Sequence, residues 1–249
     1  MATVGAEEQA IEALRTLPTA PAWLFVEAWS LTPGQALDPI GPPAPLVRAL
    51  SKSPALGLVR CEAACAATLD DTLGSPGERA RLEQIILRGS EQVPLDGLAV
   101  DLTSLPALDE HAVDFVEELA AAAHATGRRV GVLTRMTCRG VECEGVRGTL
   151  GPVARAADVV SLEELDQDMP AIEVRQRRRV GVLALELDAR VAPRVFLGVA
   201  RTSDLAARLV DASARGLGGV DVGRLGDAPR CAFDLIDAWT AKRPPPPCP

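Results

Sequence analysis

Acidic residues recur at the ends of short apolar segments in this chain of 249 residues. In LDGLAVDL, Asp101 stands two residues after Ala99, and in DVVSLEEL, Glu163 stands two residues after Ser161. Side chains two residues apart lie on the same face of a strand. If these segments are parallel strands, their carboxyl ends meet at one edge of the sheet, which we call the mouth. The alternation then predicts that five acids converge there: Glu27, Asp101, Glu163, Glu186 and Asp221.

An acidic mouth supports three kinds of arrangement. Two carboxylates held apart can act as acid and base, or as acid and nucleophile, in glycoside cleavage. Three or more can bind Mg²⁺ or another hard cation. Alternatively, the acids are solvated strand ends that pair with cations such as Arg135, Arg201 and Arg224. Because like charges crowded together raise each other's pKa or require a cation, a working site must show one of these two consequences.

Two pairs of cysteines also follow predicted strands. Cys61 and Cys65 have CxxxC spacing, and Cys138 and Cys143 have CxxxxC spacing. Four thiolates at the mouth can bind Zn²⁺ or an iron–sulfur cluster, although neither spacing is the usual CxxC. Buried free thiols are one alternative, and local disulfides in an oxidising compartment are the other.

The segments that carry these residues are eight apolar runs, rich in Val and Leu, which alternate with helical patterns. The runs cover residues 22–29, 55–62, 95–102, 129–134, 158–165, 180–187, 194–200 and 218–225. The helical patterns cover residues 78–88, 109–126, 203–215 and 230–242. This alternation predicts a (β/α)₈ TIM-like barrel, complete or lacking a strand. An open doubly wound parallel sheet is the alternative if residues 180–187 are helical.

Composition and termini restrict the organisation and the partners. We expect one domain over residues 21–242, an N-terminal helical extension over 1–20 and a proline-rich tail over 243–249. The net charge of -8 argues against a nucleic-acid partner, and no segment is apolar enough to span a membrane. No signal peptide pattern opens the chain, so we expect the cytoplasm, or secretion if the chain is the mature part of a precursor. The oligomeric state is left open.

Four of the segments resemble strands of the chitinase-like family-18 glycoside hydrolases. LDGLAVDLT resembles that family's fourth strand, which carries a DxxDxDxE signature, and Asp96, Gly97 and Asp101 match it. ADVVSLEELD resembles the sixth strand, RVFLGVA the seventh and RGLGGVDVGRLGD the eighth. The resemblance implies a TIM barrel with a sugar site at its mouth.

The chain departs from that pattern at the residues that do the family's chemistry. Ala99 replaces an Asp of the signature, and Thr103 replaces the Glu that donates a proton. A Thr hydroxyl cannot act as a general acid near neutral pH. Aromatic residues are only 3% of the chain, with no Tyr, so the platforms on which sugars stack are scarce. Trp29, beside the first predicted strand end, is the candidate for stacking, with a core position as the alternative.

These observations lead to one principal hypothesis and two alternatives. The principal hypothesis is a chitinase-like barrel that binds, and if active hydrolyses, a glycan or similar small polar ligand. Asp101 would orient the ligand or stabilise charge, and acid or base work would fall to Glu27, Glu163 or Glu186. Further ligand contacts are expected from Trp29, Thr103, Asp221 and Arg201. The alternatives are a catalytically silent scaffold and a metal-dependent enzyme with Zn²⁺ or Mg²⁺ at the acids or cysteines; otherwise no cofactor is expected.

Overall fold

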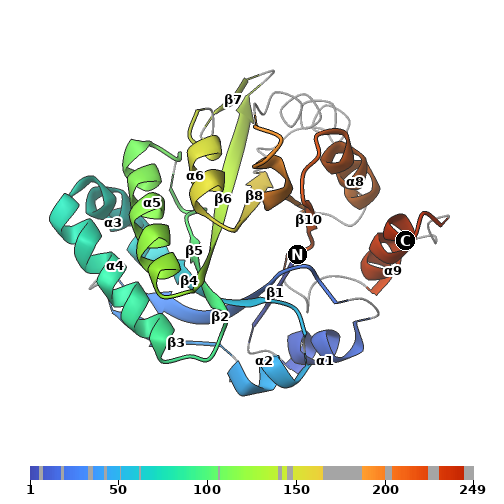
Figure 1. Cartoon of the computed structure of the whole chain (residues 1–249), viewed down its shortest axis with the longest axis horizontal. Coiled ribbons are helices and arrows are strands. Elements are labelled where there is room, and N and C mark those ends of the chain that lie inside the picture. Colours follow the sequence, from blue (N-terminus) through green and yellow to red (C-terminus); the bar gives the residue numbers. More distant parts are fainter. Residues whose placement is uncertain are drawn as a thin grey trace.

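Short segments rich in Val, Leu and Ala form one parallel sheet that curls into a barrel, with helices packed around it (Figure 1). Its strands are β1 (Ala2–Val4), β2 (Leu24–Leu31), β4 (Ala55–Cys61), β5 (Gly97–Asp101), β6 (Arg129–Arg139), β8 (Val159–Glu164), β9 (Val195–Gly198) and β10 (Gly219–Asp221), paired in that order. This computed structural model describes residues 1–5, 8–17, 20–32, 36–41, 44–50, 52–61, 63–105, 107–139, 142–144, 148–164, 187–199, 204–223 and 230–243.

The first and last strands of the sheet are joined by backbone hydrogen bonds. Met1 N donates to Val220 O over 2.9 Å, Val222 N donates to Met1 O over 3.2 Å, and Thr3 N donates to Gly223 O over 2.9 Å. Two further strands are antiparallel additions, β3 (Leu37–Pro39) to β2 and β7 (Glu142–Glu144) to β6. The predicted barrel is therefore confirmed, and the open sheet is not the fold.

One strand of the barrel differs from the prediction. β8 pairs directly with β9, through Val160 and Val195 among other pairs, so no strand lies between them. The strand predicted over residues 180–187 was expected between them, and residues 180–186 lie outside the described residues. The eighth strand of the barrel is instead β1, a three-residue segment inside the region predicted to be an N-terminal extension. It was not predicted because three residues are too few to show a periodicity.

The helices lie outside the sheet, and α5 has ordinary start and stop signals. They are α1 (Glu8–Thr16), α2 (Ala44–Leu50), α3 (Ala63–Gly74), α4 (Pro76–Glu91), α5 (Glu110–Ala125), α6 (Leu150–Ala156), the 3₁₀ turn Ala192–Arg194, α8 (Leu205–Ala214) and α9 (Arg230–Thr240). Asp109 caps α5, because its side chain accepts a hydrogen bond from Ala112 N. Gly127, with φ of 74°, turns the chain after the same helix. Within the described ranges, no helix is long and apolar enough to cross a membrane.

Strand alternation divides the buried residues into two layers. One face of β5 presents Leu98 and Val100 to the helices, where they join a core with residues such as Phe115 and Leu119 of α5. The opposite face fills the barrel interior. Its apolar cluster consists of Met1, Phe25, Leu56, Leu58, Ala99, Leu133, Val159 and Phe196. The alternation of inward and outward side chains predicted for LDGLAVDL is therefore present in β5.

A charged cluster lies between α4 and α5, away from the barrel interior. The buried Arg79 donates to Glu118 over 2.9 and 3.2 Å and to the Leu73 carbonyl over 2.9 Å. Glu83 shares a hydrogen bond with Glu118. Burial, followed by this hydrogen bond and the charge of Glu118, raises the pKa of Glu83 to about 7, whereas Arg79 holds the pKa of Glu118 below its ordinary value. The two carboxyl groups therefore hold one proton between them near pH 6.

This pair predicts a loss of stability as the pH rises from about 4.5 to 7. In that range the folded protein keeps a proton on Glu83 that the unfolded chain has released, so the unfolding free energy falls with pH. Glu83→Gln should remove this dependence and stabilise the protein at pH 8 by about 1 kcal/mol, a figure reduced because water reaches the half-buried pair. Urea denaturation at pH 4.5 and pH 8 measures it. Glu91→Gln, at an exposed position of the same helix, is the control, and equal pH slopes for the two variants would contradict the prediction.

Candidate functional site

Four acidic side chains point into the barrel near the carboxyl ends of its strands. Glu27 lies on β2, Asp101 on β5, Glu163 on β8 and Asp221 on β10. Counted around the barrel from β1, these are strands two, four, six and eight. Alternate strands of a TIM barrel supply the side chains of one layer, and therefore the even-numbered strands bring their acids toward the same axis. The predicted convergence of these four residues is what the structure shows.

Arg60 joins two of these acids. It lies on β4, between β2 and β5, and its guanidinium contacts Glu27 over 2.5 Å and Asp101 over 3.7 Å. The two carboxylate side chains are only 8% exposed, whereas the Arg60 side chain is 41% exposed. A buried carboxylate is costly without a partner, so one cation at the rim compensates two nearly buried charges.

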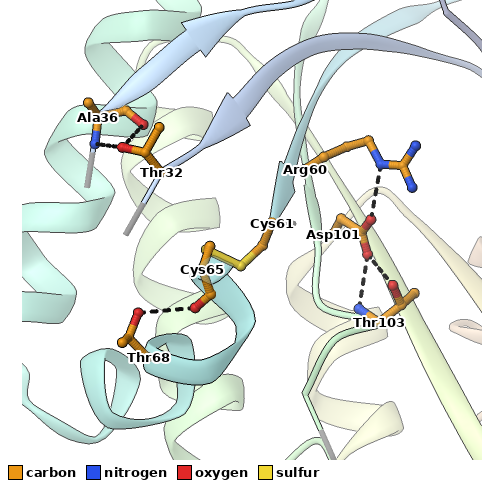
Figure 2. Close-up of a disulfide and its surroundings, with 8 residues drawn as sticks. All are labelled: Thr32, Ala36, Arg60, Cys61, Cys65, Thr68, Asp101 and Thr103. Carbon is orange, nitrogen blue, oxygen red and sulfur yellow. Dashed lines mark hydrogen bonds and ion pairs between the residues drawn. A yellow bond between two sulfur atoms is a disulfide. The ribbon is translucent and has the colours of Figure 1, made fainter. Parts of the chain in front are cut away.

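Thr103 holds the other oxygen of Asp101. Its backbone N–H and its hydroxyl both donate to Asp101 Oδ1, over 3.0 and 2.5 Å, while Arg60 approaches Oδ2. Figure 2 shows the Asp101 carboxylate between the two residues. The arrangement fixes the carboxylate rotamer, and a fixed carboxylate is suited to orienting a ligand or stabilising positive charge.

Asp221 lies deeper, where it accepts hydrogen bonds from two neutral groups and interacts with the buried amino group of Met1. It is 3% exposed, accepts a hydrogen bond from the Ser161 hydroxyl over 2.6 Å, and accepts another from Gly223 N over 2.9 Å. Ser161 precedes Glu163 by two residues on the inner face of β8. The hydrogen bond therefore places Asp221 level with Ser161, one step below Glu163 toward the barrel interior.

Glu163 is the mouth acid with the most perturbed environment. The residue is exposed, and partial desolvation of its carboxyl is the main cause that raises its pKa above the ordinary value. The Asp101 and Asp221 carboxylates raise the pKa further, against the opposing effect of Arg60 and Arg135. Among the described residues, none donates a hydrogen bond to this carboxyl or forms an ion pair with it. The crowding of like charge therefore adds to the rise of this pKa, and a perturbed pKa is one of the two consequences expected at a working site.

Gly198 makes room for Glu163. It lies beside Glu163 on the neighbouring strand β9, and a Cβ atom there would come within 3.1 Å of Glu163 Cα and 3.4 Å of Glu163 Cγ. The glycine therefore lets the Glu163 side chain lie over β9 toward the mouth.

Trp29 does not lie at the mouth, so its predicted ligand-binding role is wrong. The β2 strand has a bulge after Glu27: Glu27 pairs with Leu58, but Trp29 pairs with Val59. One extra residue on β2 reverses the alternation and turns the indole outward. There it is 5% exposed, and its ring packs over Gly57, where a Cβ would come within 2.5 Å of it. Trp29 is a core aromatic, as the alternative interpretation had it.

Two other predicted site residues, Glu186 and Arg201, lie outside the described residues. The structure also adds residues that sequence reasoning did not select, Arg60 and Ser161 as contact residues of the acids. The same alternation could have found Arg60, because it follows Leu56 and Leu58 on the inner face of β4.

The described cysteine side chains form disulfides, whereas metal binding would require thiolates. Cys61 and Cys65 are joined in a disulfide, so neither sulfur is available as a thiolate, and the predicted metal role does not fit this pair (Figure 2). Cys138 and Cys143 face each other across the β6–β7 hairpin in backbone register, and their side chains lie outside the described part. Cys231 on α9 is also disulfide-bonded. Among the described residues, no group of three or more His, Cys, Asp or Glu side chains could hold a metal ion.

No family model and no curated protein sequence matches the chain. Solved structures match its fold along nearly the whole length. A chitinase from Chromobacterium violaceum ATCC 12472 is 15% identical with a TM-score of 0.66, over 94% of this chain and 97% of that one. Catalytic domain 2 of the Ostrinia furnacalis Group II chitinase is 11% identical with a TM-score of 0.66, over 99% and 98%. The fold is chitinase-like. The GH18 chitinase ChiB of Flavobacterium johnsoniae agrees, at 12% identity and a TM-score of 0.60 over 94% of both chains.

The order of strands in this chitinase-like barrel agrees with the sequence resemblance. LDGLAVDLT contains β5, which is the fourth strand of the barrel once β1 is counted. β8, β9 and β10 are then the sixth, seventh and eighth strands, as the resemblance of their segments implies. Asp101 and Thr103 therefore stand where the DxxDxDxE signature of the resembled family ends.

Proposed function

We propose that the protein binds a carbohydrate of the chitin type at the acidic mouth of its barrel. The observation that carries the proposal is the Asp101 carboxylate, fixed by Thr103 and Arg60 at the end of the fourth strand of a chitinase-like barrel. A fixed acceptor among other polar groups suits a ligand rich in hydroxyl and amide donors, since such ligands bind through a few well-placed hydrogen bonds. The structural neighbours, named as chitinases, support chitin fragments as the first class to test.

Hydrolysis by the family's usual acid is not part of this proposal. Thr103 cannot donate a proton at neutral pH, and its hydroxyl is already donated to Asp101. Glu163 is the carboxyl at the mouth whose raised pKa suits proton donation. Any hydrolysis by the wild-type protein should therefore depend on Glu163 and disappear in Glu163→Gln.

Asp101→Asn tests the proposed binding. Chitotetraose should bind the wild-type protein, and the substitution should weaken binding by about tenfold or more, because the amide loses one acceptor and no longer attracts Arg60. Isothermal titration calorimetry measures the affinities. The matched control is Asp38→Asn, at an exposed position of β3, which should bind like the wild type. Absence of chitotetraose binding by the wild-type protein, or equal affinities of both variants, would refute the proposal.

A catalytically silent interaction protein is the second candidate function. It is favoured by the contacts at Asp101, because Thr103 donates two hydrogen bonds to one of its oxygens and the Arg60 guanidinium lies 3.7 Å from the other. Contacts of this kind also suit a strand end that the protein stabilises by itself and that binds no ligand. A protein that binds no chitin fragment but keeps a stable partner through purification would support this candidate.

The disulfide bears on the compartment of either function. Disulfides persist in oxidising environments and are rare in the cytosol. Cys61–Cys65 therefore supports secretion, the second of the two expected locations, and we propose an oxidising compartment for the protein. Mass spectrometry of alkylated protein from its native source tests this, since free thiols at both positions would contradict it.

A further inference from the structure

The end of β4 is held less firmly by the sheet than the rest of the strand. Pairing with β2 continues to Cys61, which lies opposite Leu31. Pairing with β5 stops at Val59, opposite Val100. Arg60 and Cys61 therefore have a strand neighbour on one side only, although Arg60 carries the guanidinium that contacts carboxylates on both flanking strands.

The Cys61–Cys65 disulfide supplies a second attachment at this point. Cys65 lies in the first turn of α3, is 3% exposed and belongs to the core between the helices and the sheet. The Thr68 hydroxyl donates to the Cys65 carbonyl over 3.1 Å and adds to the order of this turn. The covalent bond thus connects the residue next to Arg60 to a buried anchor, as Figure 2 shows.

We infer that the Cys61–Cys65 disulfide positions Arg60 between Glu27 and Asp101, so that the arrangement of the mouth carboxylates depends on the oxidation state of these two cysteines. Arg60 is a positioning residue in this scheme, since it orders groups that would contact a ligand. Reduction by a dithiol breaks the S–S bond with two electrons and two protons and gives two thiols, while the dithiol becomes a cyclic disulfide. The end of β4 then keeps only its pairing with β2.

The consequence for the mouth is electrostatic. Arg60 lowers the pKa of Glu163, whereas Asp101 raises it. A guanidinium that moves away from the mouth leaves Glu27 and Asp101 without their shared cation and removes its opposing effect on Glu163. The titration of Glu163 therefore reports the position of Arg60 without any ligand. The affinity for chitotetraose also reports this position, but only this second measurement rests on the proposed function.

The experiment compares the Cys61→Ala, Cys65→Ala double variant with Arg60→Gln, Arg60→Lys and the wild type. The titration is followed by the ¹³C signal of the Glu163 carboxyl, assigned by its loss in Glu163→Gln. We expect Arg60→Gln to raise the midpoint by about half a pH unit or more, since a nearby positive charge is lost. The double variant should move the midpoint in the same direction by a smaller amount, and Arg60→Lys should restore part of the wild-type value.

Chitotetraose affinity should fall by about tenfold in Arg60→Gln and by a smaller factor in the double variant, because the carboxylates lose their fixed geometry. Arg48→Gln, which removes an exposed arginine from the ion pair with Asp96, is the control and should change neither measurement. Reduction of the wild type should reproduce the double variant, and reduction of the double variant should have no further effect, which separates this disulfide from others.

A double variant with the wild-type Glu163 midpoint would overturn the inference, as would a shift that Arg60→Gln does not share. If the double variant fails to fold, the reduced wild type gives the same comparison. A wild-type protein that binds no chitotetraose would refute the proposed function alone, since the titration still decides whether the disulfide positions Arg60.

Discussion

Phe25→Ala should lower the free energy of unfolding by about 3–5 kcal/mol, the range measured when a large aromatic side chain is truncated in a packed core. Phe25 is 0% exposed and lies at the centre of the barrel, with Leu56, Leu58 and Ala99 in the same cluster. A closed barrel cannot collapse into the space that the ring leaves, because its wall is a continuous hydrogen-bonded sheet. Urea denaturation at fixed pH measures the change.

Gly131 provides a sharper test of the same packing. A Cβ at this position would come within 2.8 Å of the Phe25 ring and 2.9 Å of Leu56 Cδ1. Gly131→Ala alone should therefore destabilise the protein by about 1–3 kcal/mol through overpacking. In the Phe25→Ala background the ring is absent, so the added methyl fills part of the cavity. The two substitutions should show a coupling of at least about 1 kcal/mol in a double-mutant cycle.

The control for both variants is Val210→Ala on α8, where the side chain is 45% exposed, and it should change stability by no more than about 0.5 kcal/mol. Additive effects of Phe25→Ala and Gly131→Ala would show that the ring does not lie against Gly131. A cost for Phe25→Ala close to that of Val210→Ala would place the ring outside the barrel interior.

Alternation along the strands was enough to predict most of the mouth. It placed Asp101 and Glu163 correctly because β5 and β8 are regular and a period of two survives to the strand end. It failed at Trp29 because the bulge after Glu27 changes the parity by one residue. A bulge of this kind depends on how two strands fit together, and the sequence of one strand carries no periodicity that reveals it.

The identity of the eight strands shows a similar limit. β8 and β9 pair directly, with no strand between them where one was predicted, whereas the three residues of β1, which were not predicted as a strand, pair with β2. The packing of the whole barrel decides which segments become strands of the sheet. Composition shows only which segments are able to form a strand. Arg60 was missed for a different reason, because its position between Glu27 and Asp101 follows from the strand order β2–β4–β5, which no single segment of the sequence shows.

The positions of the acids explain why this barrel can hold so much negative charge at one end. Each acid comes from a different even-numbered strand, and three of the four have a partner within the protein that compensates the charge. Arg60 forms ion pairs with Glu27 and Asp101, whereas Asp221 accepts hydrogen bonds from Ser161 and Gly223. Among the described residues, none gives Glu163 an ion pair or a hydrogen bond, and burial together with the neighbouring carboxylates raises its pKa. The mouth therefore combines one carboxyl whose pKa is raised with one carboxylate that is firmly fixed.

Thr103→Glu should create or strongly increase hydrolysis of chitotetraose, by at least about 10²-fold over Thr103→Gln, the effect typical of a positioned general acid. The resemblance places a proton-donating Glu at this position, and the structure places Thr103 within hydrogen-bond distance of Asp101. A glutamate introduced there would lie beside the Asp101 carboxylate, which raises the pKa of the new carboxyl and favours its protonated form near neutral pH. Release of reducing ends, followed by chromatography of the products, measures the turnover.

Thr103→Gln is the matched control, because it has the same shape as the glutamate and no acidic proton. Binding must be measured for both variants, since Thr103 also helps to fix Asp101, and a loss of affinity would hide a gain in turnover. A glutamate variant that binds chitotetraose and releases no more product than the glutamine variant would show that position 103 is not equivalent to the family's acid. The barrel would then share the chitinase-like architecture while its mouth serves another purpose, and the fixed Asp101 would be the residue from which to search for it.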